Sequence, residues 1–421
     1  MKKVLMIAHQ FPPVGGSGVQ RTTKFVKYLG NYGWKPIVLT RDIQRLSFRD
    51  DSLIKDIPED TKIIRTSPWC LPELPGILSL FGKVIAMKML IPDGERLWQH
   101  FSRKAAVKTI KEEKVDVIYT TSFPYSSHLL GIYLKKKFPS TPWIADFRDE
   151  WTNNPNVQDF HHNKFRSNAE KKLEAKVLAV ADCVITNTPV MAENFINGSE
   201  SLRQKFFVIP NGYDEEDFAG LSKAAPNNEK FTITYTGLFY GRRKPDTFLD
   251  AVRILLSDKS IDKSKFQVNL IGNFKPEYIN GIISKYGVGE VVKVLPYMKH
   301  KESVQQLIRS DALFLVAGKG EDAFYLGKIF EYMNTGRPII AVVPEHGAAA
   351  MLIKDTNSGY VSDSDDSRKT AENVLKLYGD WLNKSSSLSP DWKKISRFER
   401  KVLTEELTKV FETAINKCSK Q

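Results

Sequence analysis

Cysteine is scarce in this sequence, whose 421 residues include only Cys70, Cys183 and Cys418. Three widely spaced cysteines without a Cys-x-x-Cys pair exclude a disulfide scaffold and a cysteine-based zinc site. A few unpaired cysteines are typical of proteins from a reducing compartment. The sequence therefore predicts a cytoplasmic protein.

Long hydrophobic runs are also missing. No uninterrupted apolar run approaches the roughly 18–20 residues that span a bilayer. The first apolar run, residues 4–8, is shorter than the roughly 7–15 apolar residues of a signal peptide, and no small-residue cleavage site follows it. We expect a buried first strand there.

Acidic charge is in deficit, with 49 Asp and Glu against 62 Lys and Arg and a formal net charge of +13. Such an excess suits nucleic acid, an anionic membrane surface or phosphorylated substrates. The basic residues are scattered, and no basic arm or aromatic ribonucleoprotein motif is present, which argues against nucleic acid. A generally basic, solvated surface explains the charge equally well.

Short apolar runs alternate with helical patterns along almost the whole chain, which predicts an α/β fold with parallel sheets. The first expected strands are residues 3–8, 36–39, 62–66, 115–120, 143–147, 183–186 and 207–209. After a polar stretch at residues 220–230, the second series is 231–236, 267–271, 291–295, 312–316, 338–343 and 359–361. The two series predict two similarly built domains, residues 1–210 and 211–395.

Two helical patterns are clear enough to assign faces. In residues 168–180 the expected buried positions are Ala169, Leu173, Val177 and Val180. The residues expected to avoid that face are Glu170, Lys171, Lys172 and Glu174. The last segment, residues 396–421, is expected to form a helix that returns to the first domain, because one of its faces is apolar: Leu403, Leu407, Val410, Phe411 and Ala414.

Glycine-rich loops follow the first strand of each series. Gly15 and Gly16 stand between the first strand and a helix, where they allow a tight turn or the close approach of an anion to the helix amino terminus. Arg242, Arg243 and Lys244 follow residues 231–236, at the strand end where open α/β sheets bind ligands. Three cations could neutralise a diphosphate, and a solvated basic turn is the alternative.

The segment at residues 321–347 carries a third candidate. A loop with Gly327 precedes a short helix that bears Glu331. A carboxylate there can accept hydrogen bonds from two adjacent sugar hydroxyls while nearby amides face a phosphate. An ordinary glutamate on a helix surface is the alternative.

Together these motifs give the whole chain a resemblance to the retaining glycosyltransferases of family 4. The resembling pieces are HQFPPVGGSG, VIPNGYD, YTGLFYGRRKP and LGKIFEYMNTGRPIIA. ADFRDEW and IPDGERLW resemble a subgroup that builds bacterial surface polysaccharides. The resemblance implies the glycosyltransferase B fold, in which two Rossmann-like domains face each other across a cleft.

The resemblance also implies roles for individual residues. In the first domain, Gly15 and Gly16 match a loop that passes close to the donor diphosphate and the reacting sugar. The residues that match donor-binding or catalytic positions in the second domain are Gly237, Arg242, Arg243, Lys244, Tyr297, Met298, Gly327, Lys328 and Glu331. Among them, Arg242 or Arg243 with Lys244 would hold the diphosphate, and Glu331 would contact the ribose. Tyr297 and Met298 would receive the base, and backbone amides near Gly327 and Lys328 would face the phosphates.

The chain departs from the family pattern at two places. The position of the family's first motif glutamate is Ala323, with Glu321 and Asp322 just out of register. A histidine frequent near the end of residues 143–147 is absent, and Asp146, Arg148 and Asp149 stand there instead. These three would line the acceptor side or form a buried network of ion pairs.

The resemblance implies transfer of a sugar from a nucleoside-diphosphate sugar to an acceptor hydroxyl, with retention and with neither metal nor cofactor. No side chains in the sequence assemble a metal site. The expected acceptor is a glycan or lipid-linked precursor of a surface polysaccharide, met at the inner face of an anionic membrane. Residues 74–90, with Lys83 and Lys88, suit that membrane interface or a covered hairpin. A nucleotide-sugar 2-epimerase and an inactive scaffold are the competing hypotheses.

Overall fold

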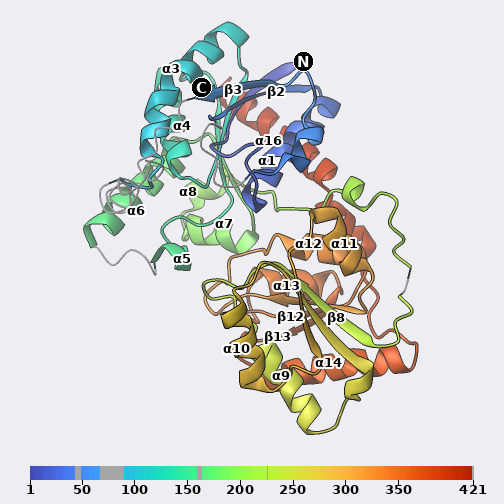
Figure 1. Ribbon diagram of the computed structural model, residues 1–421. Helices are drawn as coiled ribbons and strands as arrows, with labels where there is room; N and C mark the ends of the chain where they lie inside the picture. Colours follow the sequence, from blue (N-terminus) through green and yellow to red (C-terminus); the bar gives the residue numbers. More distant parts are fainter. Residues whose placement is uncertain (43–48, 67–89, 159–163, 225, 420–421) are drawn as a thin grey trace. The chain divides into compact units, whose positions relative to one another are not determined.

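The computed structural model describes residues 1–42, 49–66, 90–158, 164–224 and 226–419. The chain forms two compact units (Figure 1). Unit 1 consists of Met1–Pro210 with Arg400–Gln421, and unit 2 of Asn211–Glu399. Unit 2 thus continues to Glu399 rather than ending at residue 395.

Unit 1 is built on a seven-stranded sheet in the order β3-β2-β1-β4-β5-β6-β7, and every strand pair is parallel. Its strands are β1 (Lys2–Ile7), β2 (Trp34–Arg41), β3 (Lys62–Thr66), β4 (Val117–Thr121), β5 (Trp143–Phe147), β6 (Cys183–Thr186) and β7 (Phe206–Val208). The chain moves outward from β1 in one direction, to β2 and β3, and then in the other, from β4 to β7. The switch point of this sheet therefore lies between β1 and β4.

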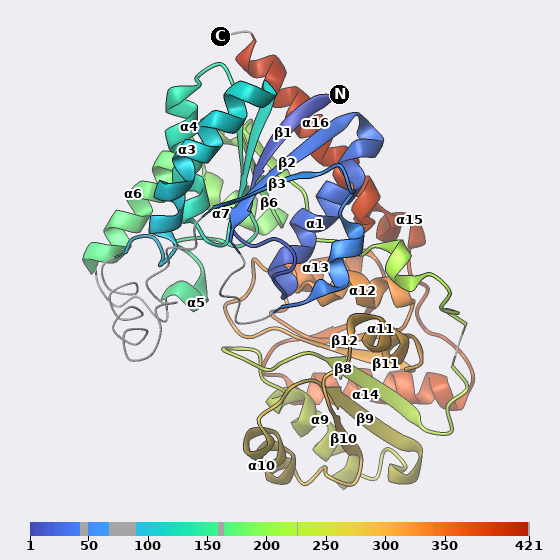
Figure 2. The same ribbon diagram turned by 45° about the horizontal axis from the view of Figure 1, so that its top comes forward.

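The described helices of unit 1 are α1 (Ser17–Leu29), α3 (Arg96–Glu113), α4 (Ser126–Lys137), α5 (Pro155–Gln158), α6 (Lys164–Val180), α7 (Pro189–Ile196), α8 (Glu200–Arg203) and α16 (Arg400–Cys418). The last helix, α16, runs along α1 (Figure 2). Its five expected core positions are all buried, and Phe411 meets the Trp34 ring edge-on with centroids 4.9 Å apart. The apolar face of α16 thus belongs to the core of unit 1.

Unit 2 has a six-stranded parallel sheet in the order β10-β9-β8-β11-β12-β13. Its strands are β8 (Phe231–Thr236), β9 (Phe266–Ile271), β10 (Val292–Leu295), β11 (Ala312–Val316), β12 (Ile339–Val342) and β13 (Gly359–Ser362). Its helices are α9 (Asp246–Ser257), α10 (Pro276–Tyr286), α11 (His300–Ile308), α12 (Lys328–Thr335), α13 (Ala348–Asp355), α14 (Ser367–Leu382) and α15 (Trp392–Ile395). The switch point lies between β8 and β11.

Two separate cores sandwich the sheet of unit 2. Phe314 and Val316 of β11 join one core with α9 and α14, whereas Leu313 and Leu315 join the other with α11, α12 and α13. Alternate residues of one strand entering different cores show that both faces of the sheet are covered. The fold is therefore α/β with two Rossmann-like sheets, as predicted. Expected and observed strand limits differ by at most two residues; the strand expected at 115–120, for example, is Val117–Thr121.

The expected faces of α6 are partly wrong. Glu170, expected outside, is only 3% exposed and accepts a 2.8 Å hydrogen bond from Arg166 Nε. Glu174 also turns inward and accepts hydrogen bonds from the Thr152 amide and hydroxyl at 2.8 and 2.9 Å. Burial of these two carboxylates is tolerated because each accepts hydrogen bonds from a neighbouring donor. A helical pattern assigned from apolar spacing alone does not detect such partners.

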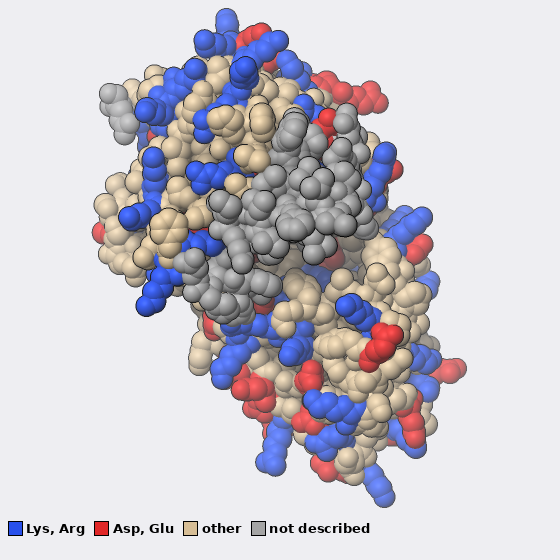
Figure 3. All heavy atoms as spheres, turned by 60° about the vertical axis from the view of Figure 1, so that its left-hand side comes forward, with Lys and Arg blue, Asp and Glu red and all other residues tan. Residues whose placement is uncertain are grey.

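The structure addresses the membrane predictions only in part. No described helix is long and apolar enough to cross a membrane. The segment at residues 74–90 lies outside the described residues except for its last residue. On the face shown in Figure 3, Lys and Arg side chains occur over both units.

Candidate functional site

A paired arginine fixes the basic loop that follows β8. Arg243 Nε donates to both carboxylate oxygens of Glu321, at 3.1 and 3.0 Å, and Nη1 donates to the Tyr240 hydroxyl at 2.6 Å. The Glu321 side chain is 1% exposed and also accepts from the Gly318 amide at 2.8 Å. The Glu321 carboxylate thus accepts hydrogen bonds from the loop after β8 and from the loop after β11. These bonds hold the Arg243 guanidinium in one position at the end of β8.

The loop after β11 can pass beneath the basic loop because it contains glycines. A Cβ added to Gly318 would lie 2.3 Å from Arg242 Cβ and 2.4 Å from the Arg242 carbonyl oxygen. In return, Arg242 Nη1 donates to the Lys319 carbonyl at 3.0 Å. The sequence analysis named Glu321, Asp322 and Gly327 of this loop but not Gly318, which could have been recognised as a glycine close to the end of a strand. Lys244, by contrast, is simply exposed.

Lys328 contributes its ammonium group and not only its backbone amide. The ammonium donates to the Thr236 carbonyl oxygen and lies 4.7 Å from the centroid of the Tyr235 ring. Burial, with a smaller contribution from Arg243, lowers the pKa of Lys328 to about 8, against an opposing effect of Glu331. Gly237 has φ +126°, a conformation that favours glycine, and a Cβ there would fall 1.6 Å from Lys328 Nζ and displace the ammonium group.

Glu331, in the first turn of α12, has a partner that the sequence analysis missed. His300 Nε2 lies 2.9 Å from Glu331 Oε1. Because an ionised carboxylate only accepts hydrogen bonds, His300 Nε2 is the donor when Glu331 is ionised. His300 begins α11, just after the carboxyl end of β10. A polar residue at the ligand-binding edge of the predicted sheet was the sequence feature that could have identified it.

The remaining residues expected in unit 2 lie nearby in the chain. Tyr297 is exposed and Met298 half-buried, in the loop after β10. Gly327 has ordinary helical φ and ψ and room for a Cβ, so the backbone does not require glycine there. Ala323 is buried, and Asp322 is exposed.

The candidate residues gather at one edge of the unit 2 sheet. Arg243 follows β8, Glu321 follows β11, and β8 and β11 are neighbours. Lys328 reaches the same place from α12. This is the carboxyl edge of the sheet at its switch point, where open α/β folds bind ligands.

In unit 1 the glycine loop leads into α1. Gly16 precedes the helix with φ +111°, a conformation that favours glycine, and Gly15 is half-buried. A Cβ on Gly18 would lie 3.1 Å from Arg148 Nη1. Arg148 donates to the carbonyl oxygens of Gly18, Ser122 and Phe123. It therefore ties the glycine loop to the loop after β4.

Asp146 is not available to an acceptor. Of the two hypotheses for this residue, the acceptor side is therefore corrected and the buried network of ion pairs agrees with the structure. Its side chain is fully buried and accepts hydrogen bonds from Arg21 Nε and Nη2, Tyr119 and Thr121, at 3.0, 2.8, 2.5 and 2.8 Å. Burial alone would raise the pKa of Asp146, but the Arg21 charge and these hydrogen bonds outweigh it and lower the pKa. Asp146 belongs to a buried ion pair, whereas Asp149 is half-buried.

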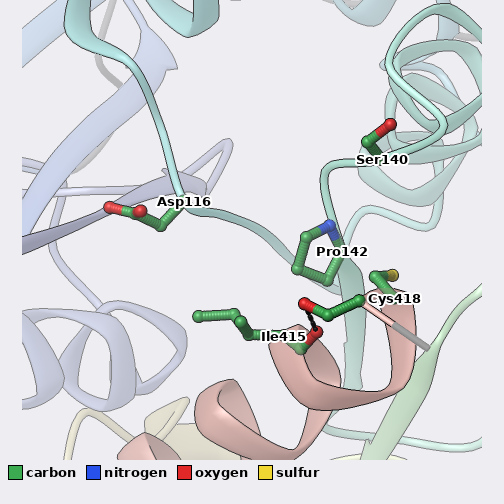
Figure 4. A pocket seen from close by; sticks show the side chains of 6 residues that line it. Asp116, Ser140, Pro142, Ile415 and Cys418 are labelled. Atoms are coloured by element: carbon green, nitrogen blue, oxygen red, sulfur yellow. Dashed lines mark hydrogen bonds between the residues drawn. The ribbon is translucent and has the colours of Figure 1, made fainter.

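A cavity of about 220 Å³ lies elsewhere (Figure 4). It is lined by Asp116, Ser140, Pro142, Ile415, Cys418 and Ser419. Asp116 precedes β4 and Pro142 precedes β5, so the cavity is at the amino edge of the unit 1 sheet, opposite the edge that carries the glycine loop. Among the described residues, no group of three or more His, Cys, Asp or Glu side chains could hold a metal ion.

Two doubly wound units with cations at a strand edge define a class of proteins that bind nucleotides and phosphates. Two family descriptions match the chain: "Glycosyltransferase Family 4" over residues 16–217 and "Glycosyl transferases group 1" over residues 230–380. The chain belongs to these family 4 and group 1 glycosyltransferases.

Individual relatives are distant. A D-inositol 3-phosphate glycosyltransferase of Streptomyces avermitilis is 26% identical over 220 residues, which are 49% of this chain and 46% of that protein. The chain thus spans about half the length of the curated relatives it matches.

Solved structures match over nearly the full length. Sucrose-phosphate synthase of Thermosynechococcus elongatus has a TM-score of 0.67 at 16% identity, covering 98% of this chain and 99% of that one. HepE of Anabaena, solved in complex with UDP and glucose, has a TM-score of 0.64 at 15% identity, covering 98% and 100%. These likenesses show the glycosyltransferase B fold.

Proposed function

We propose that the protein transfers a sugar from a nucleoside-diphosphate sugar to an acceptor hydroxyl, with retention of anomeric configuration and without a metal ion. The observation that carries the proposal is the convergence of Arg243 and Lys328 at the switch point of unit 2. The family supports sugar transfer, and the complex of HepE with UDP and glucose supports a nucleotide sugar as donor.

The cations would stabilise the leaving diphosphate. Arg243 is held by Glu321 and needs little reorganisation, while Lys328 is partly desolvated and gains most from a new anion. Arg242 and Lys244 would add charge from the same loop. As the bond from the anomeric carbon to the diphosphate oxygen breaks, the acceptor oxygen bonds to that carbon on the same face. The acceptor proton passes to the departing diphosphate.

The nucleoside would be recognised on either side of these cations. Glu331 would accept hydrogen bonds from the ribose hydroxyls, with its carboxylate oriented by His300. The exposed Tyr297 and Met298 would contact the base. Gly237 and the amides of Gly327 and Lys328 would face the phosphates.

The sugar and the acceptor are the parts of the reaction that involve unit 1. Gly15 and Gly16 would let the backbone approach the transferred sugar, and Arg148 would fix their loop. The motifs ADFRDEW and IPDGERLW favour a glycan or lipid-linked precursor of a surface polysaccharide as acceptor. We place the reaction in the cytoplasm, at the inner face of the membrane.

The decisive experiment is a ligand screen on the whole protein. UDP-, GDP- and dTDP-sugars are tested for a rise in melting temperature and for slow hydrolysis. One nucleotide series should raise the melting temperature, because binding to the folded state alone stabilises it. If no nucleotide sugar binds or is hydrolysed, the protein is an inactive scaffold and the proposal is wrong.

A further inference from the structure

Helix α6 carries both signs of charge in sequence, but the structure separates them. Arg166 and Glu170 pair on the inner side, and Arg166 Nη2 also donates to the Pro92 carbonyl at 2.6 Å. Glu174 accepts from Thr152. Both carboxylates of the helix therefore accept hydrogen bonds from other residues of unit 1 on its inner side.

The outer side of α6 is left with cations only. The exposed charged residues of the helix are Lys164, Lys171, Lys172 and Lys176. At 3.6 residues per turn they lie within an arc of about 140°, together with Phe165. Phe165 is 75% exposed, in the first turn. We call these five residues the lysine face of α6.

The neighbouring helices extend this charge. Helix α6 packs against α4, which has no acidic residue and ends in three lysines, and α4 packs against α3. Lys104, Lys108 and Lys111 of α3 are exposed. Of the two acidic residues of α3, Glu113 is paired with Lys3 and Lys62, and Glu112 is exposed with its carboxylate 3.8 Å from Lys108 Nζ. On the face shown in Figure 3, most charged side chains of unit 1 are basic.

We propose that the lysine face of α6 is a docking surface for an anionic lipid bilayer. Lysines at such a surface contribute about fivefold each to binding, and the exposed Phe165 can enter the interfacial region among them. All four cations are lysines, without the arginine forks that grip nucleic-acid phosphates in pairs. A membrane is therefore favoured over nucleic acid. This surface is independent of the donor site and of residues 74–90.

The test measures co-sedimentation of the full chain with vesicles of phosphatidylcholine alone or mixed with phosphatidylglycerol. The test variant is Lys171→Glu with Lys172→Glu and Lys176→Glu. The matched control is Lys230→Glu with Lys265→Glu and Lys293→Glu, which changes three exposed lysines of unit 2. Both triple variants lower the formal net charge from +13 by the same amount. Circular dichroism establishes that both variants are folded.

The native protein and the control should bind the anionic vesicles at low salt, less at high salt, and ignore phosphatidylcholine. The α6 variant should bind at least about 100-fold more weakly. Phe165→Ser should weaken binding without changing its salt dependence. Failure of the native protein to bind, or equal losses in both triple variants, would overturn the proposal. So would a stronger α6-dependent affinity for single- or double-stranded nucleic acid than for vesicles.

Discussion

At the scale of single residues, the proposed donor site depends on side chains that other side chains hold in place. Lys328 reaches the end of β8 only because position 237 is glycine, and Arg243 is fixed by a carboxylate from a different loop. Such an arrangement cannot be read from motifs alone. The sequence motifs predict a backbone role for Lys328 and do not connect Arg243 with Glu321.

Lys328 should make nucleotide binding depend on pH. The pKa of Lys328 is about 8 in the protein without ligand, and a bound diphosphate stabilises the ammonium form. The affinity for the nucleoside diphosphate should therefore fall as pH rises through about 8 toward about 9.5. Calorimetric titration with the preferred nucleoside diphosphate checks this. Lys328→Met should bind more weakly at pH 7 and lose that pH dependence, whereas Lys319→Met, at an exposed position, should keep both. An unchanged pH profile in Lys328→Met would count against the assignment.

Glu331→Gln should leave the fold intact and lower kcat/KM by about 10- to 150-fold. In the proposed donor complex, the change would remove charged hydrogen bonds to the ribose, worth roughly 1.5–3 kcal/mol. Steady-state kinetics with the best donor measures the effect, and a melting curve establishes that the variant is folded. Normal kinetics would remove Glu331 from the site.

His300→Ala should act through Glu331, because the ring nitrogen orients its carboxylate. We expect a rise in KM for the donor of about three- to tenfold, with kcat changed less, since about 1 kcal/mol of orientation is lost. His300→Asn, which keeps a donor, should recover part of the loss. In the Glu331→Gln background the substitution should have little further effect, and independent losses would show that the two residues do not work together.

At the scale of elements, the parallel sheets were predictable and the inner faces of some helices were not. Near-continuous apolar runs identify strands covered on both sides, and all thirteen expected strands occur. The error at Glu170 and the burial of Asp146 have one cause. A charged residue enters the interior when its partner is there, and that partner can be distant in sequence: Arg21 lies 125 residues from Asp146.

The Arg21–Asp146 pair should stabilise unit 1 by joining α1 to β5. Asp146→Ala should lower the free energy of unfolding by about 3–5 kcal/mol, because it leaves a buried guanidinium uncompensated. Urea denaturation measures the loss. The double variant Arg21→Met with Asp146→Leu should recover much of it, since it removes both charges. A stable Asp146→Ala with a raised KM for acceptor would restore the acceptor hypothesis.

At the scale of the whole molecule, the chain leaves unit 1 at Pro210 and returns to it at Arg400, so unit 2 is continuous in sequence. A fragment comprising residues 211–399 should therefore fold alone and bind the nucleoside diphosphate, because Arg243, Lys328 and Glu331 all lie within it.

The last residues of unit 2 make the position of the boundary testable. The Phe398 ring packs against Phe330 with centroids 5.2 Å apart, and the Phe398 carbonyl accepts the Tyr213 amide at 3.1 Å. A fragment ending at residue 395 loses both contacts. Its free energy of unfolding in urea should be about 1–3 kcal/mol lower than that of the fragment ending at 399, for one half-buried aromatic ring and one backbone hydrogen bond. Phe398→Ala in the longer fragment should reproduce most of the difference. Equal stabilities would show that unit 2 is complete at residue 395 and that residues 396–399 only connect it to α16.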